Sequence, residues 1–426
     1  MKIFQRKKGN YFLALDIGTE TVKTLVVKEG VLGKTVILGA SLKYFDQFGV
    51  VDELRSSPPF ARLRLARVVD ETDGIFSQEI VKKTISETIK EAQEQSLTRP
   101  NLGEEDKSSS SPFANARVGE EDKSSSSPFA NARVAKVSLP ADIFKVEVSF
   151  QSFFRKNFQK IIDEKEEKEI LETALTKGEK EISQRFGKKI GILPEDFKFL
   201  NFKILEIKIN GYKVPKLSGY KGKNLDFKIL FTFLAKSYFE NYQKIFRELK
   251  LEILKIYHPF EKFNLFLNMG DGVFLDIGGE LTQGFLLKNG NLEKIFDFPV
   301  GAKRFSQTLS ETLGILPARC RALKERYSKG ELSEEVRKRV NQIFAKDINL
   351  WFQNLNDNLK FLPKKVFLFG GGSLLPEIGE ILEQNEFLAK IIYPKDLTLL
   401  KDSFSTPLSL FDSPQYLPPL LIIPSV

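Results

Sequence analysis

Two aspartates, each placed between an apolar run and a glycine turn, are the residues of this sequence best suited to phosphate chemistry. Asp276 ends one run, and Gly278 and Gly279 separate it from a second run, Gly284 to Leu287. Glycine lacks a Cβ, so its N–H can approach a phosphate closely, and a carboxylate at a strand tip can hold hydrated Mg²⁺. The stretch from Val273 to Gly290 is equally consistent with an ordinary hairpin that has an acid at its mouth.

The same arrangement occurs near the start of the chain. Tyr11 to Leu15 is an apolar run that leads to Asp16, and Ile17 to Thr21 separates it from a second run, Val22 to Val27. Lys23 lies near the start of that second run. Two such units are much less expected by chance than one, so the pair favours a phosphate site over two unrelated hairpins.

A third glycine element follows a short apolar strand near the end of the chain. Val366 to Phe369 leads into Gly370 to Gly372, and Pro376 suits the first turn of a following helix. This element presents bare backbone and a helix N-terminus to a ligand. The sequence contains neither a P-loop motif nor a glycine-rich dinucleotide fingerprint. Two similar α/β halves that face each other would bring the three glycine turns together on one ligand.

The composition is that of a globular protein with several domains. Its 426 residues suffice for two to four domains at roughly 100 to 200 residues each. The 65 basic and 56 acidic residues are interspersed, which predicts a solvated surface and no nucleic-acid partner. One cysteine and one histidine exclude an internal disulfide and a Cys/His metal cluster, and a reducing, intracellular compartment is expected. The sequence shows no signal peptide and no long apolar span.

Hydrophobic periodicity predicts a first α/β unit that is interrupted by a module with a different pattern of apolar and charged residues. Ser77 to Gln95 is a predicted helix with Ser77 as its N-cap. Residues 141–235 combine predicted strands with a charged helix, Phe158 to Arg185, and are predicted to be inserted into the first domain. His258 has no nearby nucleophile or ligand partner and is predicted to be structural or at the surface.

A perfect repeat lies between the predicted elements. Residues 103–118 and 119–134 both read GEEDKSSSSPFANARV, and residues 56–68 are related to them. Structural repeats are longer and diverge, so this serine-rich pair favours a recent duplication. We expect residues 54–68 and 103–134 to be disordered insertions in surface loops.

The three glycine elements together resemble the motifs of the actin-like ATPase superfamily. LDIGTETVK is similar to its first phosphate motif, LDIGGELTQG to its second, and LFGGGSLLP to its adenosine motif. The resemblance covers the chain outside the insertions. It implies an α/β fold of the actin-like, ribonuclease H-like type, with two domains and a cleft between them.

Within this superfamily the sequence is most similar to the FtsA and PilM family, and it looks closer to FtsA. The run NGYKVPKLSGYKGKNLDFKILF resembles the subdomain inserted in FtsA, and FPVGAKRFSQTLSETLGI resembles the stretch after the second phosphate motif. The implied domains are 1–140 plus 236–270, the inserted subdomain 141–235, and 271–426 with a helical subdomain at 299–365.

The resemblance also implies a site for ATP and Mg²⁺. Asp16 and Asp276 would hold the metal through water, Lys23 matches a phosphate-contacting lysine, and Lys324 matches a lysine near the nucleoside. The implied nucleotide-binding residues are Asp16, Gly18, Thr19, Glu20, Thr21, Lys23, Asp276, Gly278, Gly279, Thr282, Lys324, Gly371, Gly372 and Ser373.

Three departures from the family pattern alter these expectations. Cys320 and Arg321 stand where the family has Ala and a ribose-binding Glu. Before the second phosphate strand the chain offers Asp271 in place of a water-orienting Glu or Gln, so we expect weak or absent ATP turnover. The tail, Ser413 to Val426, contains four prolines and no basic residue, so it cannot form a membrane-binding amphipathic helix and is expected to pack on the second domain.

The resemblance implies an ATP-binding, FtsA-like scaffold of bacterial cell division at the inner face of the cell membrane. Such a cytoplasmic protein would self-associate into filaments and link the tubulin-like protein FtsZ or membrane divisome proteins, with indirect membrane contact. The alternative is a PilM-like cytoplasmic adaptor of type IV pilus assembly that docks on a pilus inner-membrane protein. A small-molecule kinase of the same superfamily is a third alternative.

Overall fold

The computed structural model describes residues 11–30, 34–45, 71–98, 132–359, 363–404 and 409–423. The insertion predicted at 54–68 and residues 103–131 of the insertion predicted at 103–134 lie outside the described residues. Within the described ranges, no helix combines the length and the apolar character needed to span a bilayer.

The first sheet contains the first aspartate hairpin at its centre. Its strands lie in the order β3-β2-β1-β4-β9, and β1 pairs antiparallel with β2 while β4 runs parallel to β1. The apolar runs on both sides of Asp16 form β1 and β2, whose inner residues are buried. The strands of this sheet are β1 (Tyr11–Ile17), β2 (Thr21–Glu29), β3 (Thr35–Tyr44), β4 (Val134–Ser138) and β9 (Glu252–Ile256).

The second sheet repeats this topology. Its order is β12-β11-β10-β13-β14, with an antiparallel hairpin around Asp276 and two further strands parallel to β10. The two sheets therefore form two equivalent halves, as the paired aspartate hairpins predicted. The strands are β10 (Gly272–Ile277), β11 (Thr282–Lys288), β12 (Asn291–Phe298), β13 (Lys365–Phe369) and β14 (Leu388–Ile391).

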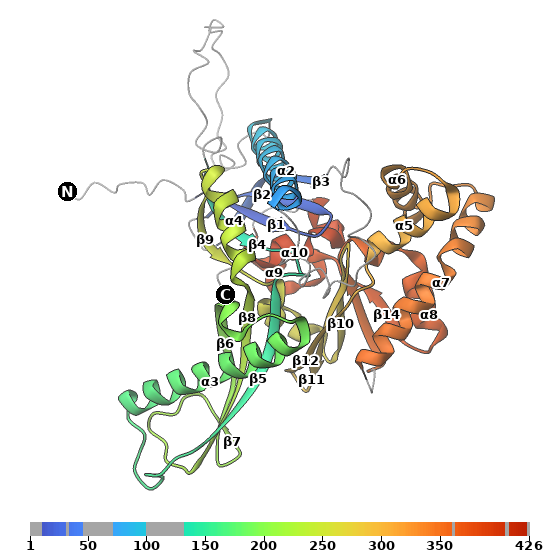
Figure 1. Cartoon of the computed structure of the whole chain (residues 1–426). Helices are drawn as coiled ribbons and strands as arrows, with labels where there is room; N and C mark the ends of the chain where they lie inside the picture. Colours follow the sequence, from blue (N-terminus) through green and yellow to red (C-terminus); the bar gives the residue numbers. More distant parts are fainter. Residues whose placement is uncertain are drawn as a thin grey trace, which may run out of the picture.

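Helices cover the outer face of each half, and Figure 1 shows the two groups on opposite sides of the molecule. Helix α2 (Glu71–Thr98) packs on β2 and β3, and it begins before Ser77, so the predicted N-cap at Ser77 is wrong. Helix α4 (Lys236–Glu248) packs beside α2. The helices of the second half are α5 (Ala302–Leu313), α6 (Pro317–Ser328), α7 (Glu334–Asn358) and α8 (Pro376–Gln384).

A third sheet projects from the first half (Figure 1), and its strands come from 145–235. It has the order β5-β8-β6-β7, and α3 (Glu164–Ile190) packs against it. Edge-to-face contacts of Phe186 and Phe197 with Phe233 build its core. The strands are β5 (Lys145–Phe154), β6 (Phe197–Ile209), β7 (Tyr212–Val214) and β8 (Asn224–Ala235). The domain boundaries stated above remain predictions.

One apolar cluster joins the two halves. Phe274 stacks on Phe285 at 4.9 Å and on Phe367 at 4.6 Å, in the same cluster as Phe12 and Leu25 of the first sheet. The tail belongs to this cluster as well. The remaining short helices are η2 (Pro194–Asp196), η3 (Pro259–Met269), η4 (Gly371–Leu374), η5 (Pro394–Asp396), α9 (Thr398–Asp402), η6 (Ser409–Asp412), η7 (Pro414–Tyr416) and α10 (Leu417–Leu421).

The tail packs on the second half, as expected, where the amide of Gly370 donates to the carbonyl of Pro414 at 3.3 Å, but it also packs on the first sheet. Helix α10 is fully buried and contacts β1 and β2 of the first sheet, not only the second half. Lys136 on β4 donates a hydrogen bond of 2.8 Å to the carbonyl of Ile423. The apolar, basic-free composition of the tail explains its burial, but composition alone does not indicate which sheet it covers.

Candidate nucleotide-binding site

The two aspartates occupy equivalent positions in the two hairpins. Asp16 lies opposite Lys23 in the β1–β2 pair, and Asp276 lies opposite Gln283 in the β10–β11 pair. Lys23 Nζ lies 2.7 Å from Asp16 Oδ2, so the first hairpin carries an ion pair where the second carries a neutral amide. A cation on the first hairpin and a carboxylate on each are suited to phosphates bound together with a divalent metal.

The two glycine turns contact each other directly. The amide of Glu280 donates to Thr19 Oγ1 at 3.1 Å. A Cβ at Gly279 would lie 2.6 Å from Glu20 Cγ, so only glycine permits this approach. The first amides of α5, those of Ala302 and Lys303, donate to the carbonyls of Gly278 and Gly279 at 2.8 and 2.9 Å. The second turn is therefore held rigidly between the first turn and a helix N-terminus.

The triple glycine packs against the second hairpin. Gly370 has a φ of 82°, and a Cβ there would lie 2.2 Å from Asp276 Oδ1. A Cβ at Gly372 would lie 2.3 Å from Ile277 Cγ2. Gly371, in contrast, faces open space. The glycines thus bring the end of β13 against Asp276 and leave one flat stretch of backbone exposed to a ligand.

All three glycine elements line a single pocket of about 410 Å³. This volume lies within the range typical of small-molecule sites. Of the fourteen predicted site residues, the pocket is lined by Asp16, Gly18, Thr19, Glu20, Thr21, Lys23, Asp276, Gly278, Gly279, Lys324, Gly371 and Gly372.

Thr282 and Ser373, the other two predicted site residues, do not line this pocket. The Thr282 hydroxyl donates to the carbonyl of Val300 at 2.7 Å and accepts from Trp351 Nε1 at 3.0 Å. The Ser373 hydroxyl donates to the carbonyl of Gly370 at 2.8 Å. Both side chains are buried and bound to the protein itself, so they stabilise the site's framework.

Burial shifts the protonation of two charged groups in the pocket. Burial, assisted by the negative charge of Asp16, raises the pKa of Asp276 to about 7, although Lys23 acts in the opposite direction. Burial also lowers the pKa of Lys324, whose Nζ donates to the carbonyl of Ala302 at 2.6 Å. A cation near Asp276 would favour its ionised form, which makes the pair of carboxylates a suitable place for a metal ion.

A bridge of side chains across the pocket was not anticipated. Tyr44, at the end of β3, donates its hydroxyl hydrogen to Glu325 Oε1 on α6 at 2.6 Å. The guanidinium of Arg321 lies 4.2 Å from the centre of the Tyr44 ring. Arg321 therefore stacks on the first half of the molecule. No local pattern in the sequence indicates this bridge, because its members are far apart in the chain.

His258 is structural, as predicted, and it also lines the pocket. Its Nδ1 accepts a hydrogen bond from the amide of Phe260 at 3.1 Å and caps η3. Burial, together with the positive charge of Lys145, lowers the pKa of His258 to about 3. The imidazole is therefore neutral at physiological pH, and its Nε2 lies 3.5 Å from Gln283 Nε2.

Asp271 lies outside the pocket, at the opposite end of β10 from Asp276. Its carboxylate accepts hydrogen bonds from the amides of Asn289 and Gly290 at 2.8 and 3.3 Å. These bonds fix the turn between β11 and β12. Asp271 therefore cannot orient a water molecule for attack on a phosphate bound near Asp276.

The donor set fits a metal bound together with phosphates better than a metal bound by protein alone. Across the described ranges, no three His, Cys, Asp or Glu side chains gather into a metal-binding group. Mg²⁺ commonly uses one or two carboxylates and takes its other ligands from water and substrate phosphates. In the described part of the chain, the amides of Thr19, Glu20 and Gly279 donate no hydrogen bond and remain available to phosphate oxygens.

The two equivalent sheets, the facing hairpins and the cleft between them define an actin-like fold. Among solved structures, the chain is similar to PilM in a PilM–PilN type IV pilus biogenesis complex. The TM-score is 0.60 at 14% identity, over 96% of this chain and 97% of the other. The ethanolamine utilization protein EutJ from Carboxydothermus hydrogenoformans gives a TM-score of 0.42 at 13% identity, over 99% of this chain and 91% of the other.

The likeness to PilM confirms the predicted actin-like α/β fold with its inserted module. No protein-family model and no curated protein sequence matches the chain. The predicted closer kinship with FtsA therefore stays a prediction.

Proposed function

We propose that this protein binds ATP together with Mg²⁺ in the cleft between its two halves. One observation carries the proposal: the two aspartate hairpins and the triple glycine converge on a single pocket of about 410 Å³. Asp16 and Asp276 would hold the hydrated metal, and Lys23 and the free turn amides would contact phosphates. Gly371 would lie against the base. The phosphates would lie close to the carboxylates of Asp16 and Asp276, and Mg²⁺ would neutralise part of this negative charge.

Turnover in this site is proposed to be slow. Attack on the γ-phosphate needs a side chain that orients or deprotonates water. Asp271 is remote from the pocket, and Gln283 and the neutral His258 face each other inside it. The lowered pKa of His258 makes its imidazole a weak base, and the Gln283 side chain is buried against that imidazole, at 3.5 Å between the two Nε2 atoms. The site is better suited to retaining a nucleotide than to cleaving it.

The similarity to PilM favours a role as a cytoplasmic adaptor at the inner face of the membrane over a division scaffold. The similar PilM structure is a complex with PilN in type IV pilus biogenesis. We propose that this chain likewise binds a cytoplasmic segment of a membrane-anchored pilus protein. The predicted links to FtsZ and divisome proteins have no comparable support.

A groove between the inserted module and the first half has the character of a peptide site. It measures about 470 Å³ and lies between β6, α4 and the edge strand β9. Its walls are mainly apolar and include Leu200, Phe239 and Ile253, while Arg247 and Lys255 add positive charge. An extended segment with apolar and acidic residues could add to the edge of β9 and fill these walls.

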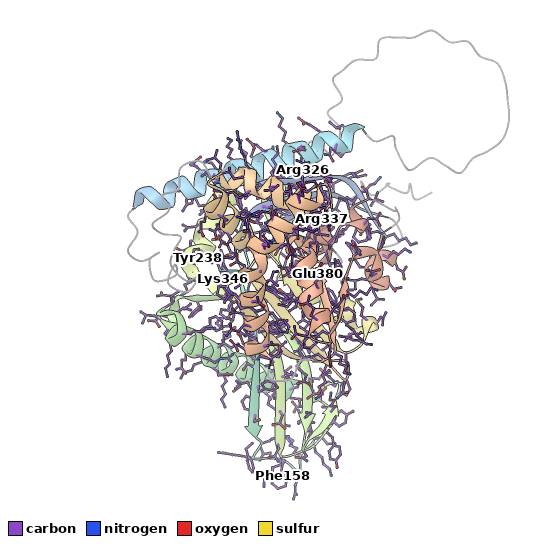
Figure 2. All side chains as sticks on the ribbon, turned by 90° about the vertical axis from the view of Figure 1, so that its right-hand side faces the viewer. Phe158, Tyr238, Arg326, Arg337, Lys346 and Glu380 are labelled. Carbon is purple, nitrogen blue, oxygen red and sulfur yellow. The ribbon has the colours of Figure 1, made fainter. Side chains whose placement is uncertain are left out.

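The adaptor proposal is tested with the cytoplasmic segment of a pilus membrane protein encoded beside this gene. Fluorescence anisotropy of the labelled segment should show binding to the wild type and severalfold weaker binding to Phe239→Ala and Arg247→Glu. Arg337→Glu is the matched control, because Arg337 lies on α7 in the second half (Figure 2). Neighbouring division and cell-wall genes, with no binding of pilus segments, would instead favour the division scaffold. Self-association stays a prediction, to be checked by sedimentation velocity with and without ATP.

A further inference from the structure

The far end of the inserted sheet carries exposed aromatic and basic residues that neither the cleft nor the groove uses. We propose that this end binds the surface of a membrane rich in anionic lipids. We call it the aromatic tip and define it as residues 154–161, 210–213 and 216–223. Figure 2 shows Phe158 at the extremity of the molecule, where the sheet ends.

The three segments of the tip are joined by hydrogen bonds. The amide of Arg155 donates to the carbonyl of Lys223 at 2.8 Å, and the amide of Lys223 donates to Asn210 Oδ1 at 3.0 Å. The amide of Ile162 donates to the carbonyl of Tyr220 at 2.8 Å. The tip is therefore one ordered surface rather than three independent loops.

Large apolar side chains of the tip face solvent. Phe154 is 66% exposed, Ile161 59% and Tyr212 79%, and Phe158 and Tyr220 are also exposed. The core of the module is complete without them, because Phe227, Phe231 and Phe233 already fill it. Exposed apolar residues that gather at one end of a molecule typically mark an interaction site.

Four lysines of the tip are available to an external partner, whereas Arg155 and Lys213 are paired with Glu166 and Glu206. Lys156, Lys160, Lys216 and Lys221 are exposed, and none forms an ion pair within the described part of the chain. Lys223 Nζ lies 4.6 Å from the centre of the Phe154 ring.

Three nearby acids, Glu166, Glu206 and Glu167, are in contrast already bound by the protein, whereas Asp163 and Glu164 at the start of α3 are exposed. Arg155 pairs with Glu166 at 2.6 Å, and Lys208 pairs with Glu206 at 2.7 Å. Glu167 accepts hydrogen bonds from the amides of Leu217 and Ser218 at 2.8 and 3.3 Å. The tip therefore presents unpaired positive charge beside exposed aromatic rings.

This combination matches an anionic lipid surface better than a protein groove. Aromatic rings settle at the level of the headgroups, and lysines are attracted to anionic lipids within a Debye length of the surface. The tip is a projecting end, not a concavity, so it can enter a bilayer interface while the rest of the molecule stays in water. Contact through the tip would supply an attachment that the buried tail does not provide.

The experiment is co-sedimentation of the full-length chain with vesicles. Vesicles of phosphatidylcholine plus phosphatidylglycerol should retain the protein, and vesicles of phosphatidylcholine alone should retain severalfold less. High salt should release the protein, because screening weakens the contribution of the lysines. The double variants Lys156→Glu/Lys160→Glu and Phe158→Ala/Ile161→Ala should each reduce binding severalfold.

The matched charge control is Lys180→Glu/Lys188→Glu on the exposed face of α3, which changes the net charge equally. This α3 control should bind the anionic vesicles more strongly than Lys156→Glu/Lys160→Glu does. Circular dichroism should show that all variants are folded. Binding that survives both tip variants, or that the α3 control reduces equally, would overturn the proposal. Binding of the tip to an RNA oligonucleotide in preference to vesicles would also overturn it.

Discussion

Tyr44 and Glu325 both line the pocket and join the two halves of the molecule there. The Tyr44 hydroxyl donates to Glu325 Oε1 at 2.6 Å, although the residues are 281 positions apart in the chain. Arg321 stacks on the same ring at 4.2 Å. All three residues line the pocket, so we infer that these contacts slow the release of a bound nucleotide.

Removing the Tyr44 hydroxyl should therefore speed nucleotide release. A hydrogen bond to a charged group contributes about 1.5 to 3 kcal/mol, so Tyr44→Phe should release a fluorescent ATP analogue roughly ten to a hundred times faster. Stopped-flow displacement with unlabelled ATP measures this rate. Tyr212→Phe, at an exposed position far from the pocket, is the control and should leave the rate unchanged. Equal rates for Tyr44→Phe and wild type would show that the bridge does not retain the nucleotide.

Glu20 should oppose phosphate binding. Its side chain lies against Gly279, between the two phosphate turns, where a carboxylate repels a phosphate. We predict that Glu20→Gln binds Mg²⁺ and ATP several times more tightly than the wild type, as measured by calorimetry. Glu94→Gln on the exposed face of α2 removes the same charge away from the pocket and should have little effect. A weaker affinity in Glu20→Gln would mean that the carboxylate itself contacts the ligand.

Nucleotide binding should depend on pH through Asp276. The pKa of Asp276 is raised to about 7 from an ordinary value of 3.8, so the empty site holds a proton below pH 7. Binding of Mg²⁺ with ATP needs the ionised carboxylate and should strengthen as pH rises from about 6 to 8, with release of a proton. Calorimetry in buffers of different ionisation enthalpy counts that proton. If no proton is released on binding, the assignment of Asp276 as a metal-holding residue is contradicted.

The same shift predicts an effect on the stability of the empty protein. A raised pKa contributes stability below the unfolded value, and this contribution is lost as pH rises through about 7. Asp276→Asn should therefore stabilise the empty protein at pH 8, by about 1 to 3 kcal/mol after allowance for solvent screening. Thermal melts at pH 5 and pH 8 measure the difference, which should be largest at pH 8. A variant less stable than the wild type at pH 8 would contradict the burial argument.

Thr282 should affect stability but not nucleotide affinity. Thr282→Val leaves the indole N–H of buried Trp351 without its acceptor, which costs about 1 to 3 kcal/mol. The chain contains a single tryptophan, so its fluorescence reports this unfolding directly. ATP affinity at a temperature where both proteins are folded should be unchanged. A large loss of ATP affinity in Thr282→Val would instead indicate that Thr282 contacts the phosphates.

Local patterns were sufficient to predict the two hairpins and the triple glycine, because strand, acid and turn follow one another in the chain. The roles of Thr282 and Ser373 were not predictable in this way. The Thr282 hydroxyl is bound by groups that only the folded structure brings near, such as Trp351 on α7, whereas the Ser373 hydroxyl turns back to the carbonyl of Gly370, three residues earlier. The bridge from Tyr44 and the burial of the tail against the first sheet have the same origin. They depend on the packing of distant elements, which hydrophobic periodicity does not encode.

The most direct test of the nucleotide site compares two aspartates at opposite ends of β10. Asp276 lines the pocket, whereas Asp271 caps a turn at the opposite end of β10. Calorimetric titration of ATP in the presence of Mg²⁺ should show binding to the wild type and to Asp271→Asn. Asp276→Asn should bind at least about tenfold more weakly, since a charged metal contact is lost. Equal affinity of all three proteins would contradict the account of the cleft as a site for ATP and Mg²⁺.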